Sequence, residues 1–437
     1  MTDGPDKADD AAAPDGLTGD WGGLRTSLRD AGLELGVTYI GEGLGNPAGG
    51  VKRGAIYEGR LEMSLDIDLA KAIGWDGALI HANAYQIHGR GLSAKDLGNN
   101  FLVASSIEAL RSSRLFDLWF QQELFDRRVS VRAGQIAADD EFFISDYGAT
   151  FVNSTFGWPG ILAADLPSGG PAYPLATPGF RIKLQPAKSL TLSAALFDGD
   201  PAGPGQGDPQ ARDRSGTNFR TSDAPFTIGE LAYAVKPDKS DDRLPATYKL
   251  GAWYHAGRFD DVRFDNTSRS LADPASNGIA ATHRGNYGGY VVLDQMIWRR
   301  PDTEDEGLGA FLRLSGSPSN RNVIDFYADG GLTFKGIVPS RADDILGLGI
   351  AFARVSSAAR NLDSDTNAFT GSDAPRRAFE AALELTYKAQ VTPWWSIQPD
   401  LQFIIHPAGN AANPASASGT EPIPNAFIIG LRSTIKF

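Results

Sequence analysis

The chain has 437 residues, a formal net charge of −12, 50 glycines, 26 prolines and no cysteine. The excess of acidic residues argues against a nucleic acid partner, and the lack of cysteine excludes a disulfide framework. No window approaches about 18 uninterrupted apolar residues, which excludes transmembrane helices. A transmembrane β-barrel is not excluded, because its strands are only half apolar.

The N-terminal part divides into a tail and a helix. Residues 1–16 are acidic and rich in Ala and Pro, which predicts a disordered tail. They contain no apolar signal-peptide core, so we expect any signal peptide to have been removed. Residues 17–32 are predicted to form a short helix, since Asp20 can cap it and Leu24 and Leu28 share one face. This narrow apolar stripe predicts a helix docked on the periplasmic rim of a barrel.

From residue 33 onward, apolar and polar residues alternate with period two. In residues 56–69, for example, nearly every second residue is apolar and the residues between are Glu, Arg, Ser or Asp. We count sixteen such segments, an even number, as in single-chain bacterial outer-membrane barrels. The predicted strands cover residues 33–41, 56–69, 77–88, 115–125, 129–136, 179–186, 189–198, 226–236, 246–256, 286–299, 307–316, 324–335, 344–355, 377–390, 395–406 and 426–437.

The loops and the last strand distinguish a barrel from a soluble sandwich. Tight turns alternate with long loops rich in Gly, Asp, Ser and Asn, as expected for periplasmic turns and extracellular loops. The last strand ends the chain, and its edge stays uncovered unless the sheet closes on the first strand. We therefore predict an all-β fold, a closed antiparallel transmembrane β-barrel over residues 33–437, in the outer membrane of a Gram-negative bacterium.

One long segment, at about 137–178, interrupts the alternation. Its five prolines exclude a long helix or a central strand, and loops of this length are usually functional or disordered. Its seven aromatic residues, Tyr147 and Trp158 among them, argue for order. We predict that this constriction loop folds into the mouth of the barrel and narrows the pore.

The polar phase of the early strands offers residues that suit a sugar. Arginine and amide side chains can pair with hydroxyl groups, and a tryptophan ring can stack on the C–H face of a pyranose. For the substrate-binding pore eyelet the candidates are Arg60, Trp119, Gln121, Arg132 and the loop residues Asn153 and Trp158. Further lumen candidates are Glu58, Glu62, Asn83, Tyr85, Glu123 and Arg181. The alternative is a solvated barrel wall of ion pairs that binds nothing.

We predict no catalytic residue, no metal ligand and no cofactor. The five histidines are scattered and none has the spacing of a metal pair. Residues 363–367 resemble the start of a calcium loop, but Ala368 replaces the required Gly and Ala374 the bidentate Glu, so a solvated loop is expected there. An outer-membrane lipid hydrolase is the enzymatic alternative, and no Ser/His pair for it is evident in the sequence.

Five motifs, in order along the chain, give a family resemblance. They are LTGDWGGLR at 17–25, FVNSTFGWP at 151–159, PAYP at 171–174, YKAQVTPW at 387–394 and QPDLQF at 398–403. With them the chain resembles the carbohydrate-selective porins of Gram-negative outer membranes, the OprB type. The resemblance implies a sixteen-stranded barrel whose inward loops form an eyelet for glucose and related monosaccharides.

The resemblance leaves several properties open. A general, unselective diffusion porin is the nearest alternative function. The expected partners are sugars, outer-membrane lipid and lipopolysaccharide, with no nucleic acid. The sequence does not decide between a monomer and a homo-oligomer, nor which sugar is preferred.

Overall fold

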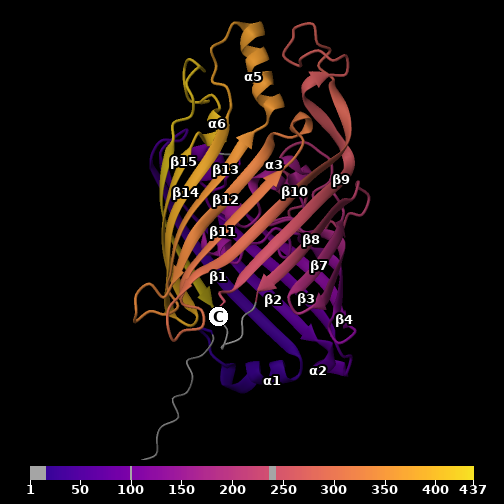
Figure 1. Ribbon diagram of the computed structural model, residues 1–437, viewed down its shortest axis with the longest axis vertical. Helices are drawn as coiled ribbons and strands as arrows, with labels where there is room; N and C mark the ends of the chain where they lie inside the picture. Colours follow the sequence, from indigo (N-terminus) through magenta and orange to yellow (C-terminus); the bar gives the residue numbers. More distant parts are fainter. Residues whose placement is uncertain (1–15, 99–100, 236–242) are drawn as a thin grey trace, which may run out of the picture.

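The computed structural model describes residues 16–98, 101–235 and 243–437. Within these ranges sixteen antiparallel strands form one closed barrel, in which β1 pairs with both β2 and β16 (Figure 1). The fold class, the strand number and the closure are those predicted from the alternation. The predicted disordered tail lies outside the described residues, apart from Gly16.

The strands follow the chain around the barrel, each paired with its neighbours in sequence. They are β1 (Leu33–Ala48), β2 (Gly54–Asp68), β3 (Ala78–Gly89), β4 (Ser112–Leu124), β5 (Val129–Ile136), β6 (Thr177–Ala187), β7 (Leu190–Phe197), β8 (Phe226–Val235), β9 (Ala246–Asp265), β10 (Ala280–Arg299), β11 (Gly307–Gly316), β12 (Ile324–Lys335), β13 (Ile345–Val355), β14 (Phe379–Thr392), β15 (Trp395–Ile405) and β16 (Ala426–Lys436).

Short helices occupy the connections. They are η1 (Trp21–Gly23), α1 (Leu24–Asp30), α2 (Leu69–Ile73), the π-helical η2 (Ser93–Leu97), η3 (Gly148–Thr150), η4 (Ser154–Phe156), α3 (Gly160–Asp165), η5 (Pro167–Gly169), α4 (Pro209–Arg212), η6 (Ser319–Arg321), α5 (Ser357–Thr370) and α6 (Pro407–Asn410). In the part of the chain that the structure describes, no helix combines the length and apolarity needed to cross a bilayer.

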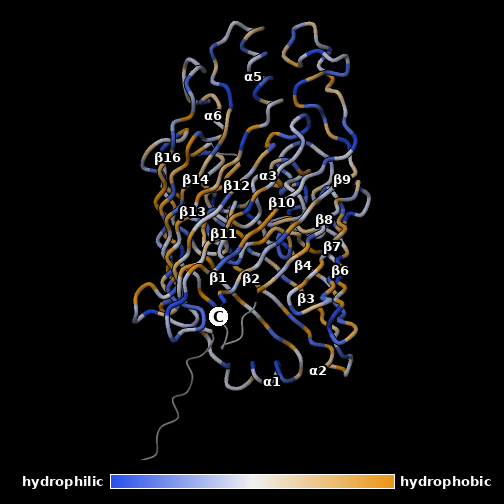
Figure 2. The backbone as a smooth tube through the Cα atoms, viewed as in Figure 1, coloured by the Kyte–Doolittle hydropathy of each residue, from blue (hydrophilic) through white to orange (hydrophobic). Residues whose placement is uncertain are grey.

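The alternation places apolar side chains on the outside of the barrel. Leu231, Leu250 and Leu431 are 39%, 59% and 52% exposed, whereas inward neighbours such as Glu230 are buried. Figure 2 shows apolar residues recurring along the strands in the middle of the wall. Exposed leucines at this density would be unfavourable in water and are favourable against lipid.

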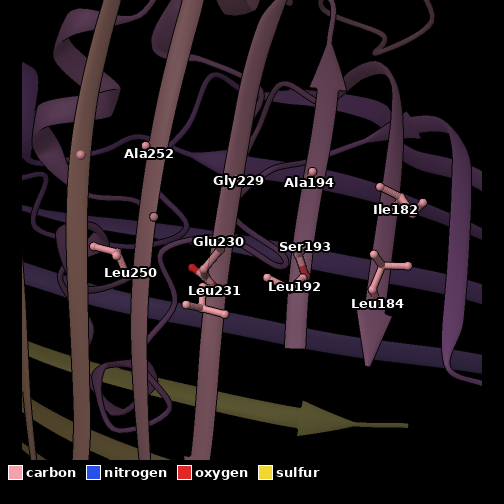
Figure 3. A pocket seen from close by; sticks show the side chains of 12 residues that line it. Ile182, Leu184, Leu192, Ser193, Ala194, Gly229, Glu230, Leu231, Leu250 and Ala252 are labelled. Carbon is pink, nitrogen blue, oxygen red and sulfur yellow. The ribbon is translucent and has the colours of Figure 1, made fainter. Parts of the chain in front are cut away.

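A shallow groove of about 670 Å³ crosses this outer surface (Figure 3). Its floor is a row of small residues that face one another across neighbouring strands, Ala194 with Gly229, Gly229 with Ala252, and Ala252 with Gly289. Leucines of β6 to β9 flank the floor. The groove is therefore part of the apolar outer face.

The outer end of the barrel differs from the sequence prediction in several places, and β1 continues to Ala48, beyond its predicted end at residue 41. Strands β9 and β10 continue well beyond the predicted ends, into a tall hairpin. The predicted solvated loop at 363–374 is wrong, because helix α5 covers most of it. The Asp365 carboxylate of this helix accepts hydrogen bonds from Arg263 of β9 at 2.8 and 3.0 Å, which ties the helix to the hairpin.

The N-terminal helix docks where the barrel closes. Helix α1 starts later than predicted, at Leu24, and Asp20 supports it from outside by accepting from the backbone N–H of Thr26 at 2.8 Å. The Arg25 guanidinium donates to the terminal oxygen of Phe437 at 2.6 Å, and the Leu17 N–H donates to the Lys436 carbonyl at 2.8 Å. The N-terminal segment thus contacts the end of β16, beside the seam with β1.

This docking gives a prediction for the orientation of the helix. The first strand of an even-stranded barrel starts at the periplasmic rim, and Thr26 is exposed there. We expect a membrane-impermeant maleimide to label a Thr26→Cys variant only after the outer membrane of whole cells has been permeabilised. Labelling of intact cells would place the helix on the outer face instead.

Candidate functional site: the pore constriction

The segment 137–176, between β5 and β6, lies inside the barrel and is fixed to the inner wall. The Glu384 carboxylate of β14 accepts from the backbone N–H groups of Val152 and Asn153 at 2.6 and 3.0 Å. On β8, Glu230 accepts from the Phe143 N–H at 3.0 Å. We call this segment the constriction segment; it confirms that the long loop packs inward.

The strongest attachment of the constriction segment is Arg313 of β11, whose side chain is fully buried. Its guanidinium pairs with Asp329 of β12 and donates to the carbonyl oxygens of Phe143, Gly157 and Thr155 at 2.8, 2.8 and 2.7 Å. One side chain therefore donates to three buried backbone acceptors, of which, among the described residues, only the Thr155 carbonyl has a second donor, the Tyr327 hydroxyl at 3.1 Å.

Aromatic packing completes this attachment. Phe143 stacks on Tyr290 of β10, with ring centroids 4.1 Å apart. Phe151 packs against Gly349, where a Cβ would lie 2.8 Å from its ring, and a Cβ at Gly309 would lie 2.1 Å from the ring of Tyr147. Glycine at these wall positions thus permits the close approach. The segment fills the lumen along β8 to β15, so the pore lies against the remaining wall.

The remaining wall, from β2 to β6, meets the start of the constriction segment in a group of charged side chains. Glu141 of the segment accepts from Arg132 of β5 at 2.9 Å and from Arg181 of β6 at 2.9 and 3.1 Å. Gln121 of β4 accepts from the same two arginines, at 3.0 and 2.8 Å. Strands β4, β5 and β6 and the constriction segment are thereby joined by one network of polar side chains.

Trp119 supports this group from beside it. The Arg132 guanidinium lies 3.8 Å from the centre of the indole ring, and His81 of β3 stacks on it with a centroid distance of 4.8 Å. Because β3 and β5 lie on opposite sides of β4, the indole is flanked on both sides, and only 9% of Trp119 is exposed. Its geometry holds Arg132 in place and leaves little ring surface for a sugar.

A second group lies further along the same wall. Arg60 of β2 donates to Glu62 at 3.1 Å and lies over the rings of Tyr85 and Tyr173, 4.7 and 5.1 Å from their centres. Asn83 of β3 also donates to Glu62, at 3.0 Å. Tyr173 belongs to the constriction segment, so here too the segment faces the wall.

The structure brings together ten of the twelve candidate residues from the sequence along this wall. They are Glu58, Arg60, Glu62, Asn83, Tyr85, Trp119, Gln121, Glu123, Arg132 and Arg181. Glu123 joins through Gln121, which donates to it at 3.1 Å, and Glu58 is buried further along β2.

The structure places the two loop candidates apart from these ten. Asn153 is 1% exposed and donates to Gln402 of β15 at 3.0 Å, which anchors the constriction segment to the opposite wall. Trp158 packs against the apolar core and donates to the Gly169 carbonyl at 3.0 Å. Both side chains stabilise the fold of the segment.

Sequence reasoning missed Glu141 and Tyr173 as parts of the site. The signal for Glu141 was present, since the acidic run 139–141 follows directly on the strand that carries Arg132. The pKa of Asp139 is raised to about 7 by burial and by the charge of Asp140. Burial likewise raises the pKa of the Tyr173 hydroxyl. The constriction thus combines arginines held by ion pairs with a buried carboxyl group, that of Asp139, whose neutral form is favoured.

Taken together, a closed sixteen-stranded barrel with an apolar outer face and a polar, internally narrowed lumen defines a diffusion channel of the Gram-negative outer membrane. The family model described as carbohydrate-selective porin, OprB family, matches residues 52–437. The chain belongs to this family of outer-membrane porins, which agrees with the resemblance in its motifs.

Individual relatives support the same assignment. The chain is 26% identical to Porin B of Pseudomonas aeruginosa over 436 residues, covering 95% of this chain and 90% of the relative. It is 22% identical to a putative porin, QuiX, of Acinetobacter baylyi over 440 residues, covering 96% and 93%. A high-pH structure of Pseudomonas putida OprB superposes with a TM-score of 0.85 at 25% identity, covering 98% of this chain and 99% of that one.

Proposed function

We propose that this porin passes glucose-like monosaccharides by passive diffusion into the periplasm, and that the pore eyelet is the group around Arg132, Arg181, Gln121 and Glu141. One observation carries the proposal: the constriction segment closes the lumen down onto a wall where guanidinium, amide and carboxylate groups lie within about 3 Å of one another. Family membership supports a carbohydrate as the permeant molecule.

The chemistry of this group suits a neutral polyol. Each sugar hydroxyl can donate and accept, so it can replace a contact within the group without leaving a charge unpaired. A pure cation filter or anion filter would need a ring of one sign, whereas here both signs alternate. Arg60, with Tyr85 and Tyr173 beneath it, offers a second contact along the path. Binding at each contact stays weak enough for release.

The sequence candidates Asn153 and Trp158 enter this proposal as residues that position the constriction segment. The enzymatic alternative, a lipid hydrolase, is set aside because the family is one of channels. Outside the pore, we propose that lipid chains, including those of lipopolysaccharide, contact the exposed leucines of the outer wall. A homo-oligomer that associates through this outer wall is the alternative to a monomer. Native mass spectrometry of the purified porin distinguishes the two.

The function is tested with purified protein in planar bilayers. We expect single-channel ion current to fall in steps as glucose is titrated in, with saturation, because an occupied constriction excludes ions. Sucrose, which is about twice as large, should block far less. A current that falls only in proportion to solution conductivity, equally for both sugars, would identify a general diffusion porin.

A further inference from the structure

The extracellular rim above β2, β3 and β4 carries exposed cations that have no counter-ion among the described residues. We propose that this rim binds the phosphorylated head group of lipopolysaccharide, and that Lys95 and Arg111 are the residues that hold its phosphates. The inference rests on the proposed contact between lipopolysaccharide and the outer wall, and it names the residues that would recognise the head group. It does not depend on which molecule passes through the pore.

A hollow of about 660 Å³ marks this rim. The first strand starts at the periplasmic rim, so β2 starts and β3 ends at the extracellular one. The hollow is lined mainly by Tyr57 of β2, by the end of β3 and by residues 90–111, which connect β3 to β4. Three basic side chains, those of Arg90, Lys95 and Arg111, belong to the lining. The volume lies within the range of about 300–1,000 Å³ that is typical of ligand sites.

The two carboxylates beside these cations are already engaged. The Asp96 side chain is fully buried and pairs with Arg90 at 2.9 Å and with Lys52 at 3.3 Å. Glu108 also lines the hollow, and each of its carboxylate oxygens accepts from the backbone N–H of Ser93 at 3.1 Å. Both carboxylates therefore stabilise the connection between β3 and β4, and they leave the remaining cations of the lining without a counter-ion.

Lys95 and Arg111 are these remaining cations. Both side chains are exposed, and neither forms an ion pair with a carboxylate anywhere in the described ranges. Arg214 donates to the Arg111 carbonyl at 2.9 Å, which brings a further cation to the rim. The chain as a whole has a net charge of −12, so this local excess of positive charge runs against its composition. A phosphate would supply the missing partners, since Arg binds it with paired N–H groups and Lys binds it as a point charge.

The outer face of the wall next to the hollow carries a row of polar side chains. The Tyr39 hydroxyl lies 2.5 Å from that of Tyr57 and 3.1 Å from Nε2 of His88, whose Nδ1 lies 3.0 Å from the Gln86 amide oxygen. His88 faces outward, because its neighbour Ile87 is buried in the interior. Tyrosine is typical of the membrane interface, whereas histidine and glutamine are unfavourable in hydrocarbon. The row therefore marks the outer boundary of the bilayer, and the hollow lies at the level of lipid head groups.

Lipopolysaccharide fits the hollow, the cations and the polar row together. Its acyl chains can lie on the apolar outer side chains of β2, such as Met63, which is 45% exposed. Its phosphates then reach the height of the hollow, where Lys95 and Arg111 can each form charge-assisted hydrogen bonds. A basic residue at an anionic lipid surface contributes about fivefold in affinity. A zwitterionic phospholipid would neutralise the two cations only in part, and a neutral sugar would leave both unpaired.

The test is native mass spectrometry of the purified porin in neutral detergent, titrated with diphosphoryl lipid A, monophosphoryl lipid A or phosphatidylglycerol. We expect the parent to bind diphosphoryl lipid A most tightly, monophosphoryl lipid A about fivefold more weakly, and phosphatidylglycerol more weakly still. The double variant Lys95→Ala/Arg111→Ala should bind diphosphoryl lipid A about thirtyfold more weakly, since each cation contributes about fivefold. Arg258→Ala/Arg360→Ala removes two exposed arginines from β9 and α5 at the same end of the barrel. This matched control should bind lipid A with the affinity of the parent.

The outcomes separate this site from the sugar channel. Parental affinity in the double variant, or equal affinity of the parent for diphosphoryl lipid A and phosphatidylglycerol, overturns the lipopolysaccharide site. A dimer that the double variant loses, with lipid affinity unchanged, assigns the rim to a second copy of the chain. Glucose block in planar bilayers should be equal in parent and double variant. Its absence in both overturns the sugar channel alone, whereas its loss only in the double variant assigns the hollow to the pore. Should the double variant fail to assemble, Arg111→Gln is measured, with an expected loss of about fivefold.

Discussion

Replacing Arg313 by alanine is expected to release the constriction segment and turn a narrow channel into a wide one. The substitution leaves Asp329 buried without its arginine partner, removes the donor for the carbonyl groups of Phe143 and Gly157, and removes one of two donors for the Thr155 carbonyl. Breaking a buried pair by removing one partner costs about 3–5 kcal/mol. The barrel itself keeps all its strand pairs.

The measurement is single-channel conductance together with protease cleavage of the segment. We expect several-fold higher conductance, loss of glucose block and new cleavage between residues 137 and 176, with an unchanged heat-modifiable barrel on gels. Arg354→Ala is the control, because Arg354 of β13 also pairs with an aspartate of β12, Asp325, but its side chain is 46% exposed. Exposed pairs contribute about 0–1 kcal/mol. Parental conductance in Arg313→Ala would show that the aromatic packing alone holds the segment.

The barrel could be predicted from the sequence because two solvents act on every strand. Lipid outside and water inside require every strand to alternate between apolar and polar residues. In a helix the apolar period is different, and in a soluble sheet the apolar face points inward and the polar face outward. Where that constraint ends, prediction fails. Beyond residue 256, strand β9 carries charged residues such as Arg258 and Asp260 on the part outside the membrane, and no apolar face marks its end.

The candidate site shows the same division. Arg132 and Gln121 could be predicted to face the lumen because they occupy the polar phase of regular strands, and the structure places them in contact there. The role of Asn153 could not be derived, because its partner Gln402 lies 249 residues further along the chain and no local pattern joins them. The burial of Phe116 beside the inward-facing Asp117 required a bulge, which shifts the phase of β4 by one residue and has no signal in the alternation itself.

Replacing Arg132 by alanine is the most direct test of the eyelet. Arg132 makes hydrogen bonds to Gln121 and Glu141 and lies over the ring of Trp119. Its removal takes away a charged donor for a sugar hydroxyl and leaves both acceptors to Arg181 alone. Losing one such partner costs about 1–3 kcal/mol. We therefore expect glucose block to weaken roughly tenfold or more, while ion conductance rises because a large side chain has left the narrowest part.

These two effects in opposite directions distinguish a substrate contact from general damage. Arg127→Ala removes the same charge from the exposed periplasmic turn that precedes β5 and should leave both quantities as in the parent. Arg132→Lys keeps the charge but cannot bridge two acceptors with one planar group, so its block should fall between parent and alanine variant. Unchanged glucose affinity in Arg132→Ala, with a wider pore, would mean that this arginine only narrows the channel. The sugar would then be bound along the wall by Arg60 and Tyr173.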